Sequence, residues 1–359
     1  RCIGGQSDHG ALISACDRVW RNDSVVATLT ILGATDGLAD LQSFDADGFT
    51  LVIDDQFATA VRVNYLALGG ADLTNAAIID ITSPAATGNQ DYTSPGFQAD
   101  AVFFISADEI VTINTPQTDL RVHFGVGVSS TQRWEMTANS RDGQLNAETG
   151  RYGLDVEAVS PPSVGIDPPN WRADYLGGIT NGFRLNWIKT AGTAFNSLSC
   201  LVLQGGQWAA GGLLTQTDTT TDIVVSGLAF APVGVLVGSH GTTESTADTQ
   251  QATHVFSLGA GTSTTNRAVQ CSRDLDAAAV VDCTAGIEYD EIYQNPNTST
   301  AANDGLMDVK SFDSGGVTFI MDDADPAQAW FGWMACGDAA SVARIPYQPW
   351  MQRGPVLAQ

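Results

Sequence analysis

Residues 36–55 read DGLADLQSFDADGFTLVIDD, and a close copy of this stretch returns near the end of the chain. Residues 304–323 read DGLMDVKSFDSGGVTFIMDD, which matches the first stretch without a gap at 11 of 20 positions. A weaker version, NGFRLNW, occupies residues 181–187, and its Gly182 lies as far after Gly48 as it lies before Gly316. This regular spacing is close to the usual size of one domain, so we interpret the chain as a domain-length internal repeat.

The stretch carries the signals of a β-hairpin. Asp47 and Gly48 form a typical turn pair, in which the glycine accepts a positive φ and the aspartate tolerates one. After the turn, Phe49, Leu51 and Ile53 occupy alternate positions, so their side chains are expected on one face of a strand. The aspartates change between the copies while the glycine and the apolar face stay, which favours a turn over a calcium-binding loop.

A second strand is predicted after each copy, and it ends in glycine. The three segments are residues 61–70, 198–206 and 329–337, and they are almost continuously apolar. Strands of this kind are typical of sheets that are covered on both faces. We therefore expect each segment to be a central strand.

The composition predicts an all-β fold, because 37 glycines and many turn-forming polar residues accompany no long apolar stripe of helical period. We expect tandem, jelly-roll-like β-sandwiches, two complete and one partial, related by a pseudo-threefold axis. The expected boundaries are 1–87 for the partial sandwich, 88–218 and 219–338 for the complete ones, and 339–359 for an extended C-terminal arm. The first unit starts at the level of Arg133 in the second, so we expect its opening strands to be missing or replaced.

The charge of the chain restricts its partners. Sixteen basic residues against 40 acidic ones give a formal charge of −24. Such a surface repels phosphate groups, so no direct nucleic-acid binding is expected. No apolar run approaches the ~20 residues of a membrane-spanning helix, so no membrane span is expected either.

Four of the six cysteines form two pairs with similar spacing. Cys2 and Cys16 make one pair, Cys271 and Cys283 make the other, and both pairs fall at nearly the same place in the repeat. Disulfides across neighbouring strands and buried free thiols are both open interpretations of these residues.

The sequence offers no convincing catalytic set. Its four histidines are scattered, and no GxSxG sequence marks a serine nucleophile on a strained turn. The remaining cysteines lack the spacing of a zinc site. We expect no enzymatic activity, no cofactor and no bound metal.

Sugar binding is the alternative function that the residues suggest. Trp134, Trp171 and Trp208 lie outside the core-strand pattern and could stack on sugar rings, while Asp and Asn side chains bind the hydroxyl groups. The alternative is therefore a receptor- or glycan-binding β-sandwich module whose ligand is a host surface glycan.

The C-terminal arm carries isolated apolar residues in a proline-containing sequence. Its X-Pro steps favour an extended backbone, and Tyr347, Trp350, Val356 and Leu357 are too few to form a core alone. Two interpretations are open. These residues bind a partner, or the arm is a strap that lies on the third sandwich of its own chain.

Once these blocks are assembled, the chain resembles a group of poorly characterised virion proteins of tailed bacteriophages. That group carries a GFQPxAVxFF strand, a GFGxG segment, an FxxDGFxL turn and strand, and a YLALGG strand. The matching pieces here are residues 96–104, 124–127, 44–51 and 65–70, with Ala99 where the pattern usually has proline. These motifs are structural, so the resemblance implies virion membership and brings no catalytic residues.

The resemblance and the repeat together predict a non-enzymatic virion component. We expect a capsid-surface decoration protein or a tail or fibre protein, located on the surface of the phage particle. Its expected partners are other capsid or tail subunits, including further copies of itself. Assembly is expected through exposed strand edges and the C-terminal arm.

Overall fold

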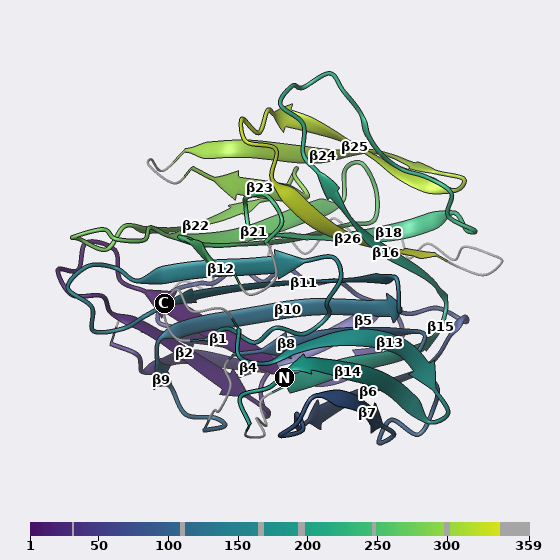
Figure 1. The fold of residues 1–359 in the computed structure, drawn as a ribbon, viewed down its shortest axis with the longest axis horizontal. Coiled ribbons are helices and arrows are strands. Elements are labelled where there is room, and N and C mark those ends of the chain that lie inside the picture. The colour runs from purple at the N-terminus through teal and green to yellow at the C-terminus, as the bar shows by residue number, and fades with distance from the viewer. Residues whose placement is uncertain are drawn as a thin grey trace, which may run out of the picture.

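The computed structural model describes residues 1–30, 32–107, 112–163, 169–192, 198–245, 249–297 and 302–337. Throughout these ranges the chain forms strands, turns and loops without a helix, which confirms the predicted all-β class. The strands build antiparallel sheets in a β-sandwich-like arrangement (Figure 1). It follows that no described segment is a helix able to cross a membrane.

The middle sandwich packs a large sheet against a small one. In order, the large sheet contains β19 (Gln251–Ala252), β12 (Thr149–Leu154), β11 (Gln132–Ser140), β10 (Leu120–Ser129), β8 (Ala101–Ser106), β15 (Leu198–Gly205) and β6 (Leu73–Ile81). The small sheet contains β13 (Arg172–Ile179), β14 (Gly182–Lys189) and β7 (Gly88–Tyr92). Between them lies a buried core that includes Phe104, Phe183 and Trp187, as expected where the apolar faces of two sheets meet.

The C-terminal sandwich repeats this layout. Its large sheet contains β16 (Gln207–Leu214), β26 (Trp330–Gly337), β18 (Pro232–Ser239), β20 (His254–Gly261), β21 (Arg267–Asp274) and β22 (Cys283–Glu288). Its small sheet contains β17 (Ile223–Val225), β25 (Gly316–Asp323), β24 (Asn303–Asp313) and β23 (Tyr293–Pro296). The core between the sheets includes Phe319, Met321 and Phe331. In Figure 1 this sandwich forms the upper, green and yellow part of the molecule.

The N-terminal part forms a half-sandwich. One sheet contains β1 (Cys2–Ser7), β2 (Cys16–Arg21) and β9 (Gln117–Thr118), and the other contains β3 (Val26–Leu29), β4 (Thr35–Asp45) and β5 (Gly48–Asp55). Residues 56–72 follow β5 without forming a strand, so the central strand expected at residues 61–70 is a wrong prediction. Its counterparts β15 and β26 are central strands, because each has a strand partner on both sides.

The predicted hairpin in residues 36–55 is present, but its turn lies one residue earlier than expected. Asp45 pairs with Gly48, so the turn residues are Ala46 and Asp47. The φ of Gly48 is not in the left-handed region, so tolerance of positive φ does not explain the glycine. At the two counterparts of Gly48, a neighbouring backbone lies too close for any side chain, so glycine is required. A Cβ on Gly182 would lie 1.8 Å from the carbonyl oxygen of Tyr92, and a Cβ on Gly316 would lie 2.0 Å from the carbonyl oxygen of Val225.

Three loops join the parts of the molecule in a ring. They are residues 8–15 between β1 and β2, residues 141–148 between β11 and β12, and residues 275–282 between β21 and β22. Each loop is joined to the next by two backbone hydrogen bonds of the same pattern. The first and second loops are joined by Ser14 N to Gln144 O and Gly143 N to Ser14 O, and the second and third by Ala147 N to Ala278 O and Ala277 N to Ala147 O. The third and first loops are joined by Val281 N to Ala11 O and Gly10 N to Val281 O. The third pair joins the last loop to the first, so the C-terminal sandwich contacts the N-terminal half-sandwich within one chain.

Candidate functional site

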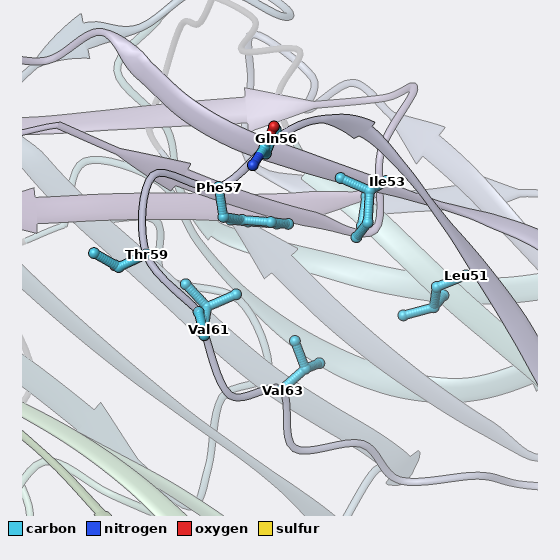
Figure 2. Close-up of a pocket in the computed structure, with 9 residues that line it drawn as sticks. Leu51, Ile53, Gln56, Phe57, Thr59, Val61 and Val63 are labelled. Atoms are coloured by element: carbon cyan, nitrogen blue, oxygen red, sulfur yellow. The ribbon is translucent and has the colours of Figure 1, made fainter. Parts of the chain in front are cut away.

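An apolar pocket of about 280 Å³ opens on the half-sandwich. Figure 2 shows side chains from β5 and from residues 56–63 around it. The residues that line it are Ala39, Leu51, Ile53, Gln56, Phe57, Thr59, Ala60, Val61 and Val63. Several of its apolar side chains are open to solvent, with Ile53 56% and Val63 42% exposed. An exposed apolar hollow of this kind marks an interaction surface.

Comparison with the C-terminal sandwich identifies the strands that would cover the pocket. The counterparts of Ile53 and Val63 in its copy of the repeat are Met321 and Phe331, which are 1% and 0% exposed. Strands β17 and β18 close this core, through the buried side chains of Ile223, Val225, Val235 and Val237. The described part of the half-sandwich has no strand in the corresponding place, so the pocket is one open half of a sandwich core.

Unpaired backbone borders the pocket. β17 adds to the edge of β25 in the C-terminal sandwich, with Ile223 opposite Phe319, whereas β5 is an edge strand among the described residues. β18 and β20 lie between β26 and β21. Among the residues that the structure describes, β1 has a strand partner on one side only, and residues 61–70 form no ladder. Such edges are templates for the addition of a further strand.

The aspartates at the hairpin end belong to the turn. Asp45 accepts hydrogen bonds from Ser43 Oγ at 2.9 Å and Thr50 Oγ1 at 2.7 Å, and these bonds, chiefly that of Thr50, lower the pKa of this carboxyl. Asp313 accepts the same two bonds in the C-terminal copy. The described residues contain no group of three or more side chains that could hold a metal ion.

The proposed disulfide between Cys2 and Cys16 is a wrong prediction. In the β1–β2 ladder Cys2 lies opposite Arg21 and Cys16 lies opposite Ser7, so the two cysteines occupy opposite ends of the hairpin. The length of the ladder separates these ends by ~17 Å, whereas a disulfide requires Cα atoms within ~7 Å. Burial raises the pKa of Cys2 to about 11, which keeps it a neutral thiol.

The second proposed disulfide is wrong for the same reason. Cys271 lies opposite Gly286, and Cys283 lies opposite Asp274, three positions away along the ladder. That offset corresponds to ~10 Å. Burial raises the pKa of Cys271 to about 12. The interpretation of these residues as free thiols therefore fits the structure, in which Cys271 is buried and Cys283 is half-buried.

The tryptophans proposed to stack on sugars lie mainly in cores. Trp134 is 0% exposed and donates from Nε1 to the carbonyl oxygen of Trp333 at 2.9 Å. Trp171 is 3% exposed in the middle core. The prediction that these two rings stack on sugars is therefore wrong. Trp208 is half-buried, donates from Nε1 to Gly205 O at 2.7 Å and meets the ring of Phe103 edge-on.

The other proposed site residues, Tyr347, Trp350, Val356 and Leu357, lie outside the described residues.

A buried cluster of ionisable side chains was not predicted from the sequence. Arg172 donates from Nε to both carboxylate oxygens of Glu157, at 3.0 and 2.9 Å, and Ser160 donates to the nearby Glu135. Burial, followed by the charge of Glu157, raises the pKa of Glu135 well above its ordinary value. The three ionic residues come from separate parts of the sequence, so no local motif marks them. All are at most 5% exposed, which favours a structural role over contact with a substrate.

The pocket, the free edge of β5 and residues 61–70 form one surface, which we call the acceptor site. It offers unpaired backbone groups beside exposed apolar side chains, the combination that binds an added β-strand. Comparison with known proteins found no matching protein family, no matching curated protein and no matching solved structure.

Proposed function

We propose that the protein is a non-enzymatic structural component of a tailed-phage virion, either a capsid-surface decoration protein or a tail or fibre protein. The acceptor site carries this proposal. Two closed sandwiches form a well-packed body, while the half-sandwich offers an incomplete sheet to a neighbouring subunit. The resemblance of residues 65–70 and 96–104 to blocks of phage virion proteins supports the same assignment.

Assembly proceeds by strand addition between β1 and residues 61–70. This is the place that β18 and β20 fill in the C-terminal sandwich. A partner strand there gains backbone hydrogen bonds and covers exposed apolar side chains such as that of Val63. Full burial of one such side chain stabilises by about 1.5–3 kcal/mol. Another virion subunit or a further copy of this chain supplies the strand.

The surface charge supports a position on the outside of the particle. At −24 the chain repels packaged nucleic acid and stays well solvated. Partners are therefore recognised through backbone pairing and apolar contact instead of through phosphate groups.

Particle composition tests the proposal. Mass spectrometry and immunogold labelling of purified particles of the encoding phage should locate the chain on mature virions. The double variant Ile53→Asp/Val63→Asp should lower its occupancy about tenfold, because charge in the pocket opposes apolar contact. The matched control is Val224→Asp, which places the same charge at an exposed strand position outside the acceptor site. Mature particles that lack the wild-type chain would refute the proposal.

A further inference from the structure

The three loops of the ring have the same conformation. The third residue of each loop, Gly10, Gly143 or Ala277, has a positive φ, of 85°, 72° and 57° in turn. The residue whose backbone amide donates to the next loop is buried in every case, and the two residues before it are exposed. A closed ring of three equivalent contacts has approximate threefold symmetry. The loops are therefore three equivalent parts of one surface.

Apolar side chains gather at the exposed positions of these loops. Leu12 and Ile13 are 74% and 53% exposed in the first loop, Leu145 is 77% exposed in the second, and Val280 is 44% exposed in the third. Backbone hydrogen bonds hold the three loops together, and Figure 1 shows them at the left edge of the molecule. A group of exposed apolar side chains marks an interaction surface, whereas single ones need no explanation. We call residues 10–13, 143–146 and 277–280 the ring surface.

Side-chain hydrogen bonds hold the loops in place. Asp142 Oδ1 accepts a hydrogen bond from Cys16 N at 3.1 Å, and Asp276 Oδ1 accepts the equivalent bond from Thr149 N at 2.9 Å. Thr149 also donates from Oγ1 to the carbonyl oxygen of Asp274 at 2.9 Å. Each of these bonds joins two different loops or the strands that flank them. The ring surface is therefore ordered before it meets a partner, which lowers the entropic cost of binding.

Acidic groups surround the exposed apolar side chains. Residues 8–15, 141–148 and 275–282 contain five carboxylates and one basic side chain, that of Arg141. Arg141 Nη1 lies 2.7 Å from Glu148 Oε2, so its charge is offset within the ring. A second copy of this surface, a nucleic acid or an anionic membrane is repelled because its charges have the same sign. Opposite charge favours a protein whose contact surface is basic.

The threefold pattern specifies the symmetry of that protein. A partner with a threefold axis presents the same residues to all three loops, so one set of contacts is used three times. The exposed residues differ between the loops, with Leu12, Leu145 and Ala279 at one position and Ile13, Asn146 and Val280 at the next. Apolar contact tolerates these differences because it is non-directional. The ring surface therefore fits the threefold axis of a symmetric assembly.

We propose that the ring surface docks on the threefold axis of a partner protein assembly that presents basic residues around an apolar centre. This docking rests on the proposed function and specifies one class of its partners, namely virion subunits that surround a threefold axis. The residues of the ring surface are different from those of the acceptor site, so the two contacts can be tested separately.

Photo-crosslinking in purified particles of the encoding phage tests the symmetry of the partner. Benzoylphenylalanine replaces Leu12, Leu145 or Val280 in turn, and mass spectrometry identifies the peptide to which each position is linked. All three positions should link to the same segment of one partner protein, because each loop meets an equivalent copy of it. The matched control places the same group at Leu214, which is 47% exposed at the end of β16, and should give no link to that segment.

Occupancy of the chain on particles tests the apolar contact. Leu12→Asp/Leu145→Asp should lower the occupancy about tenfold, because charge at these positions opposes apolar contact and repels an apolar centre. The control Val156→Asp/Leu214→Asp places the same charges at exposed apolar residues outside both surfaces and should leave the occupancy unchanged. Both variants should unfold at the Tm of the wild type, because all four side chains are exposed.

Three results on particles that carry the chain would overturn the docking and leave the proposed function standing. They are links from the three positions to unrelated segments, links to a second copy of this chain, and wild-type occupancy of Leu12→Asp/Leu145→Asp. Particles that lack the wild-type chain would refute the proposed function and this docking with it.

Discussion

Phe57 occupies, in the half-sandwich, the place that Asp325 occupies in the C-terminal sandwich. A Cβ on Gly37 would lie 2.3 Å from Phe57 Cδ1, and one on Gly305, its counterpart, would lie 3.0 Å from Asp325 Cβ. Asp325 is 0% exposed and accepts a hydrogen bond from Tyr293 Oη at 2.9 Å. The same position is thus polar and enclosed in the closed sandwich, but apolar at the mouth of the open one.

Removing the Asp325 carboxylate should destabilise the C-terminal sandwich. Asp325→Ala leaves Tyr293 Oη, Thr215 Oγ1 and Asn295 Nδ2 without this acceptor, and we expect a loss of about 2–5 kcal/mol in the free energy of unfolding. Phe57→Ala, at a half-buried position, should cost about 1–2 kcal/mol. Urea unfolding followed by tryptophan fluorescence measures both. Equal costs for the two variants would contradict the difference in enclosure.

Trp134 should be a core residue in stability measurements. Its ring packs against Trp330 at 6.4 Å between centroids, and a Cβ on Gly332 would lie 2.3 Å from it. Trp134→Ala should therefore lower the free energy of unfolding by about 3–5 kcal/mol. Trp208→Ala, at a half-buried ring, serves as the control and should cost less. A neutral Trp134→Ala variant would argue against the central core.

Acid should destabilise the protein through buried histidines. Burial lowers the pKa of His123 and His240 to about 3 and that of His254 to about 4, from an ordinary 6.5. The unfolded chain then binds these protons first as the pH falls, so the stability from neutral histidine is present above pH ~6.5 and lost toward pH 3–4. Thermal unfolding between pH 7 and 4 should show a falling Tm. His123→Gln should reduce the slope, and an unchanged slope would contradict the assignment.

Glu135 should act in the opposite direction. Burial raises the pKa of its carboxyl in the folded state above that in the unfolded chain, so the stability that the protonated form contributes is lost as the pH rises through the ordinary value near 4.5. Glu135→Gln mimics the protonated form. Its free energy of unfolding should therefore increase relative to that of the wild type as the pH is raised from 5 to 8. Urea unfolding at both pH values checks this gain. Glu148→Gln, at a partly exposed carboxyl, is the control and should show a smaller change.

The four paired cysteines should all be alkylated. In denaturant without a reductant, iodoacetamide should modify Cys2, Cys16, Cys271 and Cys283, because the strand registers hold the members of each pair apart. Peptide mass spectrometry reads out each position. Recovery of a peptide linked through Cys2 and Cys16 would contradict the β1–β2 register.

Local features of this protein were predictable from its sequence because they depend on neighbouring residues. Alternation after Gly48 predicted strand β5, and the repeated stretch predicted its counterpart β25. The same reasoning failed at residues 61–70, whose apolar character predicts a central strand but supplies no neighbours to pair with. It also placed Trp134 on the surface, although this ring fills the space between two large sheets.

The sequence by itself therefore determined the all-β class, the hairpins and the repeat of their signals. Tertiary structure alone decided which sheet each strand joins. β6 and β16 cross to the next sandwich, the three loops close a ring, and the acceptor site remains open. The physical reason is that strand pairing satisfies backbone groups common to all residues, so its partner is set by which edges lie within reach in the folded chain.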